Sequence, residues 1–146
     1  MRAAQVLILL TVCAGLVSCS DDRSPEAQLR DTIDAMELAA EEGRRSDFMD
    51  HVAPDFSGQR GRLNHQELAD LLRVQILVHS RVHAVVSNLE VELVGSRARA
   101  SMHALLTGGP KAWLPDAGRV FKIETGWKLD EEGDWILISA DWEPVL

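Results

Sequence analysis

The chain of 146 residues contains no tyrosine and only two cysteines, and neither cysteine lies beyond residue 19. The rest of the chain therefore offers no disulfide, no cysteine nucleophile and no thiolate metal site. Basic residues are also scarce, with 15 lysines and arginines against 23 acidic residues. Nucleic-acid binding depends on basic patches that neutralise phosphates, so this charge balance argues against a nucleic-acid partner.

No apolar run is long enough to span a membrane. The longest one lies between Ala3 and Val17 and is interrupted by Gln5, whereas a spanning helix needs about 20 apolar residues. An arginine precedes this run and small residues follow it, which is the pattern of a secretory signal. We therefore expect residues 1–18 to be a signal peptide.

The end of this signal, Leu16-Val17-Ser18-Cys19, resembles the lipobox of bacterial lipoproteins. The resemblance implies that Cys19 becomes the first mature residue and carries palmitate-type acyl chains; an ordinary signal with an incidental cysteine is the alternative. Ser20 stands where lipoproteins of the inner membrane typically carry aspartate. The resemblance thus favours an outer-membrane anchor that faces the periplasm, with residues 19–24 as a tether and residues 25–146 as one domain.

Three helices are predicted in the first half of this domain. The first begins with the capping residues Ser24-Pro25-Glu26 and ends at Gly43. A second is expected from Ser46 to about Val52, ended by a loop over Ala53 to Phe56. The third spans Asn64 to about His79, because Asn64 and Glu67 form a capping-box pattern. The side chains expected to be buried are Leu29, Ile33, Met36, Ala40, Phe48, Val52, Leu68, Leu71, Leu72, Gln75 and Ile76.

From Val82 onward the hydrophobic period changes to two, which predicts strands at about 82–94, 97–106, 119–129 and 135–143. The first strand is expected to bend near Ser87-Asn88. Helices followed by antiparallel strands are typical of the α+β class. Alternation gives each strand one apolar face: Leu89, Val91, Leu93, Ala98, Ala100, Met102, Ala104, Phe121, Ile123, Thr125, Trp127, Ile136, Ile138, Ala140 and Trp142.

The element order, the Asp47-Phe48 and Pro54-Asp55-Phe56 segments, and the tail Gly133-Asp134-Trp135-Ile136 with Asp141-Trp142 resemble the NTF2-like superfamily. Nuclear transport factor 2, ketosteroid isomerase and SnoaL-type cyclases share this fold. The resemblance implies a cone in which a curved antiparallel sheet wraps around three N-terminal helices and encloses a cavity. The cavity would bind a ligand through its inner wall, for which we expect Met102, Phe121, Ile123, Thr125, Trp127 and Ile138, with Trp113 at the rim.

Catalytic groups are few on this expected inner wall. Ketosteroid isomerase chemistry uses a carboxylate base with a tyrosine in the oxyanion hole, and the chain has no tyrosine. An acid/base pair of Asp55 and His51 is the alternative, although Asp55 after Pro54 also suits a simple turn. His79 and His83 lack a third ligand nearby, so neither a metal nor a cofactor is expected.

Three functional hypotheses follow for the mature domain. The leading one is a lipid-anchored protein that binds a small apolar ligand or an envelope partner protein without catalysis. The second is a SnoaL-like or dehydratase-like enzyme that uses Asp55 and His51. The third is a structural homodimer that pairs through the polar outer face of the sheet, where Arg97, Arg99, Glu124 and Asp141 are expected. Trp113 lies in the loop between Thr107 and Gly118, where it would either plug the cone or form a docking patch.

Overall fold

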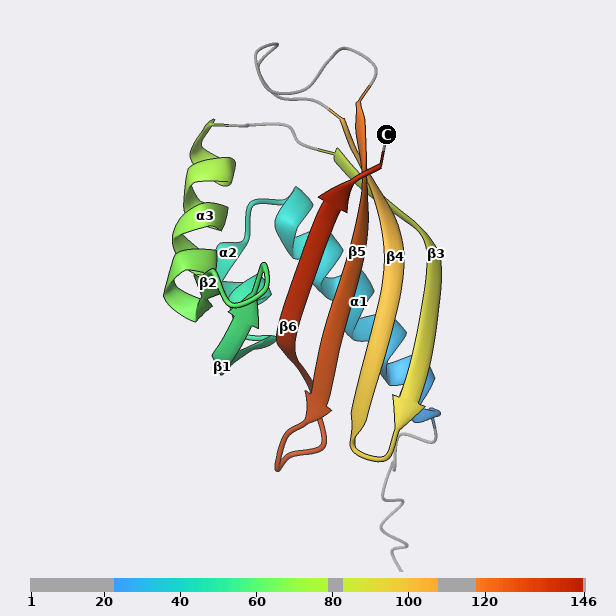
Figure 1. The fold of residues 1–146 in the computed structure, drawn as a ribbon. Helices are drawn as coiled ribbons and strands as arrows, with labels where there is room; N and C mark the ends of the chain where they lie inside the picture. The colour runs from blue at the N-terminus through green and yellow to red at the C-terminus, as the bar shows by residue number, and fades with distance from the viewer. Residues whose placement is uncertain (1–22, 79–82, 108–117, 146) are drawn as a thin grey trace, which may run out of the picture.

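The fold is a curved sheet with one long helix across its inner face and two shorter helices at one side (Figure 1). The computed structural model describes residues 23–78, 83–107 and 118–145, and of residues 75–78 only the backbone. The strands follow the order β2-β1-β6-β5-β4-β3. The element bounds are α1 (Pro25–Glu41), α2 (Arg45–Met49), β1 (Val52–Gly58), β2 (Leu63–Asn64), α3 (His65–Val78), β3 (His83–Val94), β4 (Arg97–Thr107), β5 (Arg119–Leu129) and β6 (Trp135–Pro144).

The two capping patterns predicted at the starts of α1 and α3 are confirmed. The Ser24 hydroxyl accepts a hydrogen bond from the Ala27 N–H at 3.2 Å, with Pro25 in the first turn. At α3, the Asn64 N–H donates to Glu67 Oε2 at 2.7 Å and the Glu67 N–H donates to Asn64 Oδ1 at 2.9 Å, which completes the capping box. Helix α1 buries Leu29, Ile33, Met36 and Ala39, the last of these in place of the expected Ala40.

The prediction of a helix to Val52 followed by a loop is wrong. Helix α2 ends at Met49, and Val52 is the first residue of strand β1, which pairs with β2 and runs parallel to β6. Pro54 lies between the paired positions Val52 and Ser57, where the register with β6 shifts. Its missing N–H therefore costs no ladder hydrogen bond, and a strand tolerates proline there. The sheet is consequently mixed rather than antiparallel throughout.

The meander of β3 to β6 matches the predicted strands to within one residue at each end. The expected bend is a bulge between Ser87 and Glu90, where Asn88 has a φ of 52°. The turns β3–β4 and β5–β6 lie beside the start of α1, at what we call the lower end of the sheet. The ends of β4 and β6, at Thr107 and Pro144, lie at the opposite, upper end (Figure 1).

A second bulge corrects the predicted face of two isoleucines. Gly126 pairs with Ser139 but Trp127 pairs with Leu137, so Ile138 is the extra residue in β6. The side chains of β6 before the bulge therefore point to the opposite faces from those that simple alternation predicts. Trp135 and Leu137 are buried in the core, whereas Ile136 and Ile138 are partly exposed. Their predicted place on the inner face is wrong.

Helix α1 fills the lower and middle part of the inner face. Its residues Leu29, Ile33 and Met36 belong to one core cluster with the inner residues of β4, β5 and β6. Ala100 on β4 has no exposed surface and belongs to the same cluster. The Trp135 indole N–H donates to the Pro25 carbonyl at 3.0 Å and ties the first turn of α1 to the sheet.

Candidate functional site

The inner face of the sheet carries one buried polar side chain within the described residues, Thr125. Its hydroxyl donates to the Ala100 carbonyl at 3.1 Å and accepts from the Trp127 indole N–H at 2.8 Å. One donor and one acceptor position are thus both occupied by the protein. Thr125 therefore serves the packing of the sheet, and its hydroxyl proton is not free to bind a ligand.

The other predicted wall residues differ in how deeply their side chains are buried. Met102 and Trp127 are 5 % and 2 % exposed and lie inside the core cluster. Phe121 and Ile123 lie further up β5 and are partly buried, as is Trp142 on β6. An apolar surface that neighbouring side chains do not fully cover is therefore found in the upper half of the inner face. Trp113 lies outside the described residues.

The structure places Asp55 on the outer side of the sheet, away from this apolar wall. Its side chain is 71 % exposed and pairs with the Lys128 ammonium at 3.2 Å. The hydrogen bond from Lys128 lowers the pKa of the Asp55 carboxyl, with a further contribution from a backbone hydrogen bond. A general base that works near neutral pH needs the opposite shift.

The predicted partner of Asp55, His51, is half-buried before β1, and its carbonyl accepts from the Leu137 N–H at 2.8 Å. No hydrogen bond joins the two side chains in the described part of the chain, so the geometry offers no support for an acid/base pair. His83 is exposed at the start of β3, and His79 lies outside the described residues. Within the described ranges, no three histidine, cysteine or acidic side chains are grouped as a metal site.

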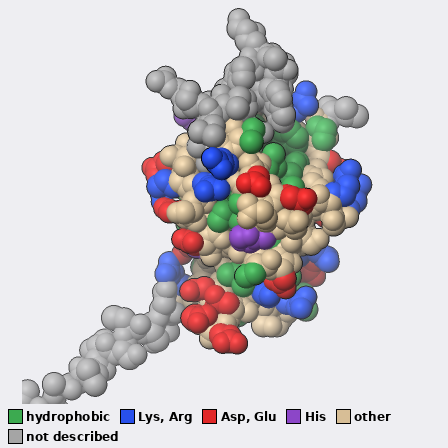
Figure 2. Space-filling model, turned by 90° about the vertical axis from the view of Figure 1, so that its left-hand side faces the viewer, with side chains coloured by type: hydrophobic (Ala, Val, Ile, Leu, Met, Phe, Trp, Pro, Cys, Tyr) green, Lys and Arg blue, Asp and Glu red, His purple; other side chains and the backbone are tan. Residues whose placement is uncertain are grey.

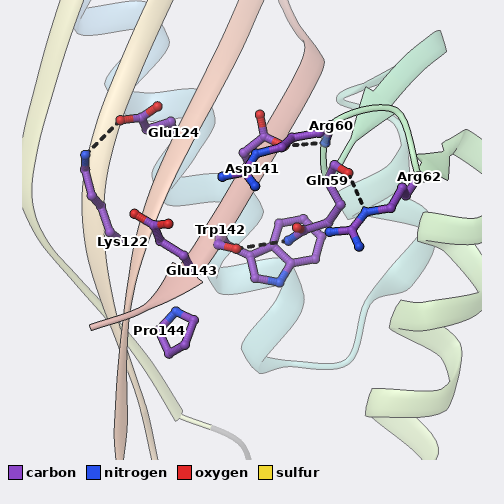
Figure 3. Close-up of a pocket in the computed structure, with 9 residues that line it drawn as sticks. All are labelled: Gln59, Arg60, Arg62, Lys122, Glu124, Asp141, Trp142, Glu143 and Pro144. Atoms are coloured by element: carbon purple, nitrogen blue, oxygen red, sulfur yellow. Dashed lines mark hydrogen bonds and ion pairs between the residues drawn. The ribbon is translucent and has the colours of Figure 1, made fainter. Parts of the chain in front are cut away.

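A depression that sequence reasoning missed lies at the upper part of β6, on the side of the β1–β2 turn (Figure 3). We call it the β6 groove; it has a volume of about 310 Å³. One wall is the turn with Gln59, Arg60 and Arg62. The opposite wall consists of Lys122 and Glu124 on β5 and of Glu143 and Pro144 on β6. Asp141 and Trp142 lie between this wall and the turn (Figure 3).

The turn is held against β6 by three hydrogen bonds. The Gln59 N–H donates to the Ala140 carbonyl at 3.0 Å, and the Gln59 side-chain amide donates to the Trp142 carbonyl at 3.1 Å. The Arg60 N–H donates to Asp141 Oδ1 at 2.7 Å. Gln59 and Arg60 have φ values of 49° and 58°, a left-handed conformation that costs roughly 1 kcal/mol or more for each residue. The contacts with β6 offset that cost and fix the direction of the turn.

Two of the charges on the opposite wall neutralise each other. Lys122 Nζ and Glu124 Oε1 are 2.9 Å apart. This contact raises the pKa of Lys122, to which Glu143 adds a smaller effect, and lowers the pKa of Glu124. Further from the groove, acidic side chains gather at the lower end of the molecule (Figure 2). The β5–β6 turn there contains Asp130, Glu131, Glu132 and Asp134.

These elements define the class of the domain: it has the NTF2-like fold, also described as cystatin-like. No protein-family model matches the sequence, and no curated protein matches it either. The fold, its α+β class and the cone-shaped arrangement predicted from the sequence are confirmed. No helix in the described residues is long and apolar enough to cross a membrane.

Three solved structures illustrate the similarity. A candidate dehydratase of the NTF2-like family from Streptomyces avermitilis has a TM-score of 0.70 at 15 % identity, over 84 % of this chain and 99 % of that one. A candidate ketosteroid isomerase from Shewanella frigidimarina has a TM-score of 0.69 at 10 % identity, over 82 % and 98 %. Bd1075 of Bdellovibrio bacteriovorus has a TM-score of 0.70 at 8 % identity, and the match covers 82 % of this chain but only 41 % of Bd1075.

Proposed function

We propose that the chain is a lipoprotein of the cell envelope whose NTF2-like domain faces the periplasm and binds a small apolar ligand, or an apolar part of an envelope partner, without turning it over. One observation carries the non-catalytic part of this proposal. The buried hydroxyl of the inner face is committed to the protein, and the predicted carboxylate Asp55 lies outside, paired with Lys128. A site for acid/base chemistry needs a titratable group within hydrogen-bond reach of its substrate.

The upper half of the inner face is the place where such a ligand would bind. In the lower half, α1 covers the sheet, and Ala98, Ala100 and Trp127 are buried against it. Phe121, Ile123 and Trp142 lie above and keep part of their apolar surface exposed. Each buried CH₂ group of a ligand contributes about 0.8 kcal/mol, and the affinity is what is left of this sum after the cost of association, about 4 kcal/mol or more, is subtracted.

The anchor is consistent with the position of the first described residues. At most about 3.5 Å of chain per residue separates Cys19 from Arg23, a reach of roughly 14 Å. The lower end, where α1 begins beside the β5–β6 turn, would therefore lie nearest the bilayer (Figure 1). The acidic residues of that turn disfavour direct adsorption to anionic lipid, so the acyl chains would supply the membrane affinity.

Substitution of Cys19 tests the anchor. In cells labelled with a fatty-acid analogue, the wild-type protein should carry the label and fractionate with membranes. Cys19→Ser should lose both properties, because acylation holds the protein there. An unlabelled wild-type protein that is released after processing would refute the lipoprotein assignment.

Complementation of a deletion strain tests the binding function. We expect Asp55→Asn and His51→Ala to retain the cellular role, and Ala104→Phe, which adds a phenyl group beside Phe121 on the inner face, to abolish it. Arg99→Phe, which adds the same group on the outer face of β4 opposite Gly126, is the matched control. Ala104 is 4 % exposed and Ala100 0 % exposed, so a larger side chain can strain the fold at either position. Ile123→Asn, at a partly exposed position of the inner face, is therefore a second variant that should also lose the cellular role. With circular dichroism confirming folded variants, loss of function in Asp55→Asn and tolerance of Ala104→Phe would support the enzyme instead.

A further inference from the structure

The β6 groove lies outside the apolar inner face and is a second place where the domain can bind a small molecule. Strand β1 ends at Gly58, opposite Ala140, whereas β6 continues to Pro144. The edge of β6 beyond Ala140 is therefore not covered by β1. The turn from Gln59 to Arg62 folds over this edge and turns the gap into a groove (Figure 3).

Neither arginine of the turn forms an ion pair within 4.0 Å in the described part of the chain, although Asp141, whose carboxylate accepts from the Arg60 N–H, also lines the groove. The Arg62 Nε donates to the Gln59 carbonyl at 3.1 Å, which orients its guanidinium and leaves the terminal nitrogens unbonded within the described residues. Arg60 is held through its backbone N–H, and its guanidinium forms no ion pair with any described carboxylate. The turn therefore offers two guanidinium groups to the groove, and guanidinium groups bind carboxylates in a bidentate manner.

The negative charge on the other side of the groove is likewise available. Lys122 and Glu124 form their own ion pair at 2.9 Å, but Glu143 forms no ion pair within 4.0 Å in the described part of the chain. Glu143 lies on the far side of Asp141 and Trp142 from the turn that carries the two arginines (Figure 3). A simple anion would meet the unpaired carboxylate of Glu143, and a simple cation would meet the two guanidinium groups. A molecule that carries both a negative and a positive group can form an ion pair with the arginines and another with Glu143.

We propose that the β6 groove binds a small zwitterion of about dipeptide size. Arg60 and Arg62 bind its carboxylate, Glu143 binds its ammonium group, and Trp142 and Pro144 contact its apolar side chain. The volume of about 310 Å³ is at the lower end of the range for small-molecule pockets, which limits the ligand to this size. Trp142 and Pro144 pair with Ile123 and Phe121 and are shared with the inner face, whereas the charged residues of the groove are not. Variants of Arg62 and Glu143 therefore test the groove without changing the inner face.

Calorimetric titration of the purified full-length protein with the dipeptide alanyl-phenylalanine tests this site. Two blocked forms provide the charge controls: N-acetyl-alanyl-phenylalanine lacks the ammonium group, and alanyl-phenylalanine amide lacks the carboxylate. Each should bind at least tenfold more weakly than the free dipeptide, since charge-assisted hydrogen bonds are about twice as strong as neutral ones. Arg62→Ala and Glu143→Gln should each weaken the free dipeptide by a similar factor.

The pattern of losses distinguishes recognition from general surface charge. The Arg62→Ala protein should bind the free dipeptide no more tightly than the dipeptide amide. The Glu143→Gln protein should bind the free dipeptide no more tightly than the N-acetylated dipeptide. Arg99→Ala and Glu92→Gln change an exposed pair of the outer face, 3.9 Å apart, and should leave binding unchanged. The proposal is overturned if the free dipeptide does not bind at millimolar concentration, if the three peptides bind equally, or if the control variants weaken binding as much as Arg62→Ala. Arg62→Lys, which retains the charge, should keep part of the affinity and guards against a folding defect of Arg62→Ala.

Discussion

Replacement of Thr125 by valine tests two properties of the core around this buried hydroxyl: that it excludes water, and that the hydroxyl stabilises the fold through its two hydrogen bonds. Valine has nearly the same shape, so the change removes the hydrogen bond to the Ala100 carbonyl and leaves the Trp127 indole N–H without its acceptor. The lost bond costs about 1 kcal/mol, and the unpaired buried N–H costs about 1–3 kcal/mol. The added methyl group returns about 0.8 kcal/mol by apolar burial. The free energy of unfolding should therefore fall by about 2 kcal/mol.

Urea denaturation followed by tryptophan fluorescence measures this change in the free energy of unfolding. In thermal unfolding, the same change should lower the Tm by about 6–10 °C for a domain of this size. In a Trp127→Phe background the N–H is absent, so Thr125→Val should cost about 0.5 kcal/mol or less. Thr32→Val, which removes a hydrogen bond from the Thr32 hydroxyl to the Gln28 carbonyl of its own helix, is the matched control and should have a small effect. A neutral or stabilising Thr125→Val would show that water or another group satisfies the indole, which would refute a dry interior.

Three further predictions concern stability and charge. Asn64→Ala should lower the free energy of unfolding by about 1 kcal/mol in chemical denaturation, because it breaks the capping box of α3; an unchanged midpoint would contradict this role. Lys128→Met should raise the pKa of Asp55 toward its ordinary value of 3.8, seen by carbon NMR of the carboxyl group. Because the folded-state pKa is lowered, the Asp55–Lys128 pair stabilises the fold above that ordinary value, and this contribution is lost as the pH falls through the lowered pKa. Glu37→Ala should speed hydrogen exchange of the Val86 N–H by about tenfold, since Glu37 accepts from it at 3.2 Å on the free edge of β3; equal exchange rates in the two proteins would show that the edge is protected by other means.

Local patterns were sufficient to predict the helices α1 and α3 and the meander. Alternating apolar residues in β3 to β5 and the capping residues Ser24 and Asn64 act within a few positions of the chain, so the sequence displays them directly. The bulge at Ser87 also has a local signal, because the adjacent asparagine tolerates a positive φ.

Features that depend on distant partners could not be predicted. Strand β1 contains Pro54, and its identity as a strand depends on parallel pairing with β6, about 80 positions later in the chain. In Trp135-Ile136-Leu137-Ile138 every residue is apolar, so alternation cannot locate the bulge that reverses the faces. The β6 groove joins the turn at Gln59 to β5 and β6 and has no motif in the sequence. The lipid anchor and ligand binding by the inner face stay predictions that the fold alone does not test.

Binding of a small apolar probe to the inner face tests the central claim most directly. Benzene is suitable because it enters dry apolar cavities, and the isoleucine methyl groups report its position by NMR. The Ile123 methyl signal, from the upper half of the inner face, should shift in a saturable manner as benzene is added. Ile136 and Ile138, which the bulge in β6 removes from that face, should show no saturable shift. Equal shifts at all three isoleucines, or no saturable shift at Ile123, would contradict an apolar binding site inside the cone.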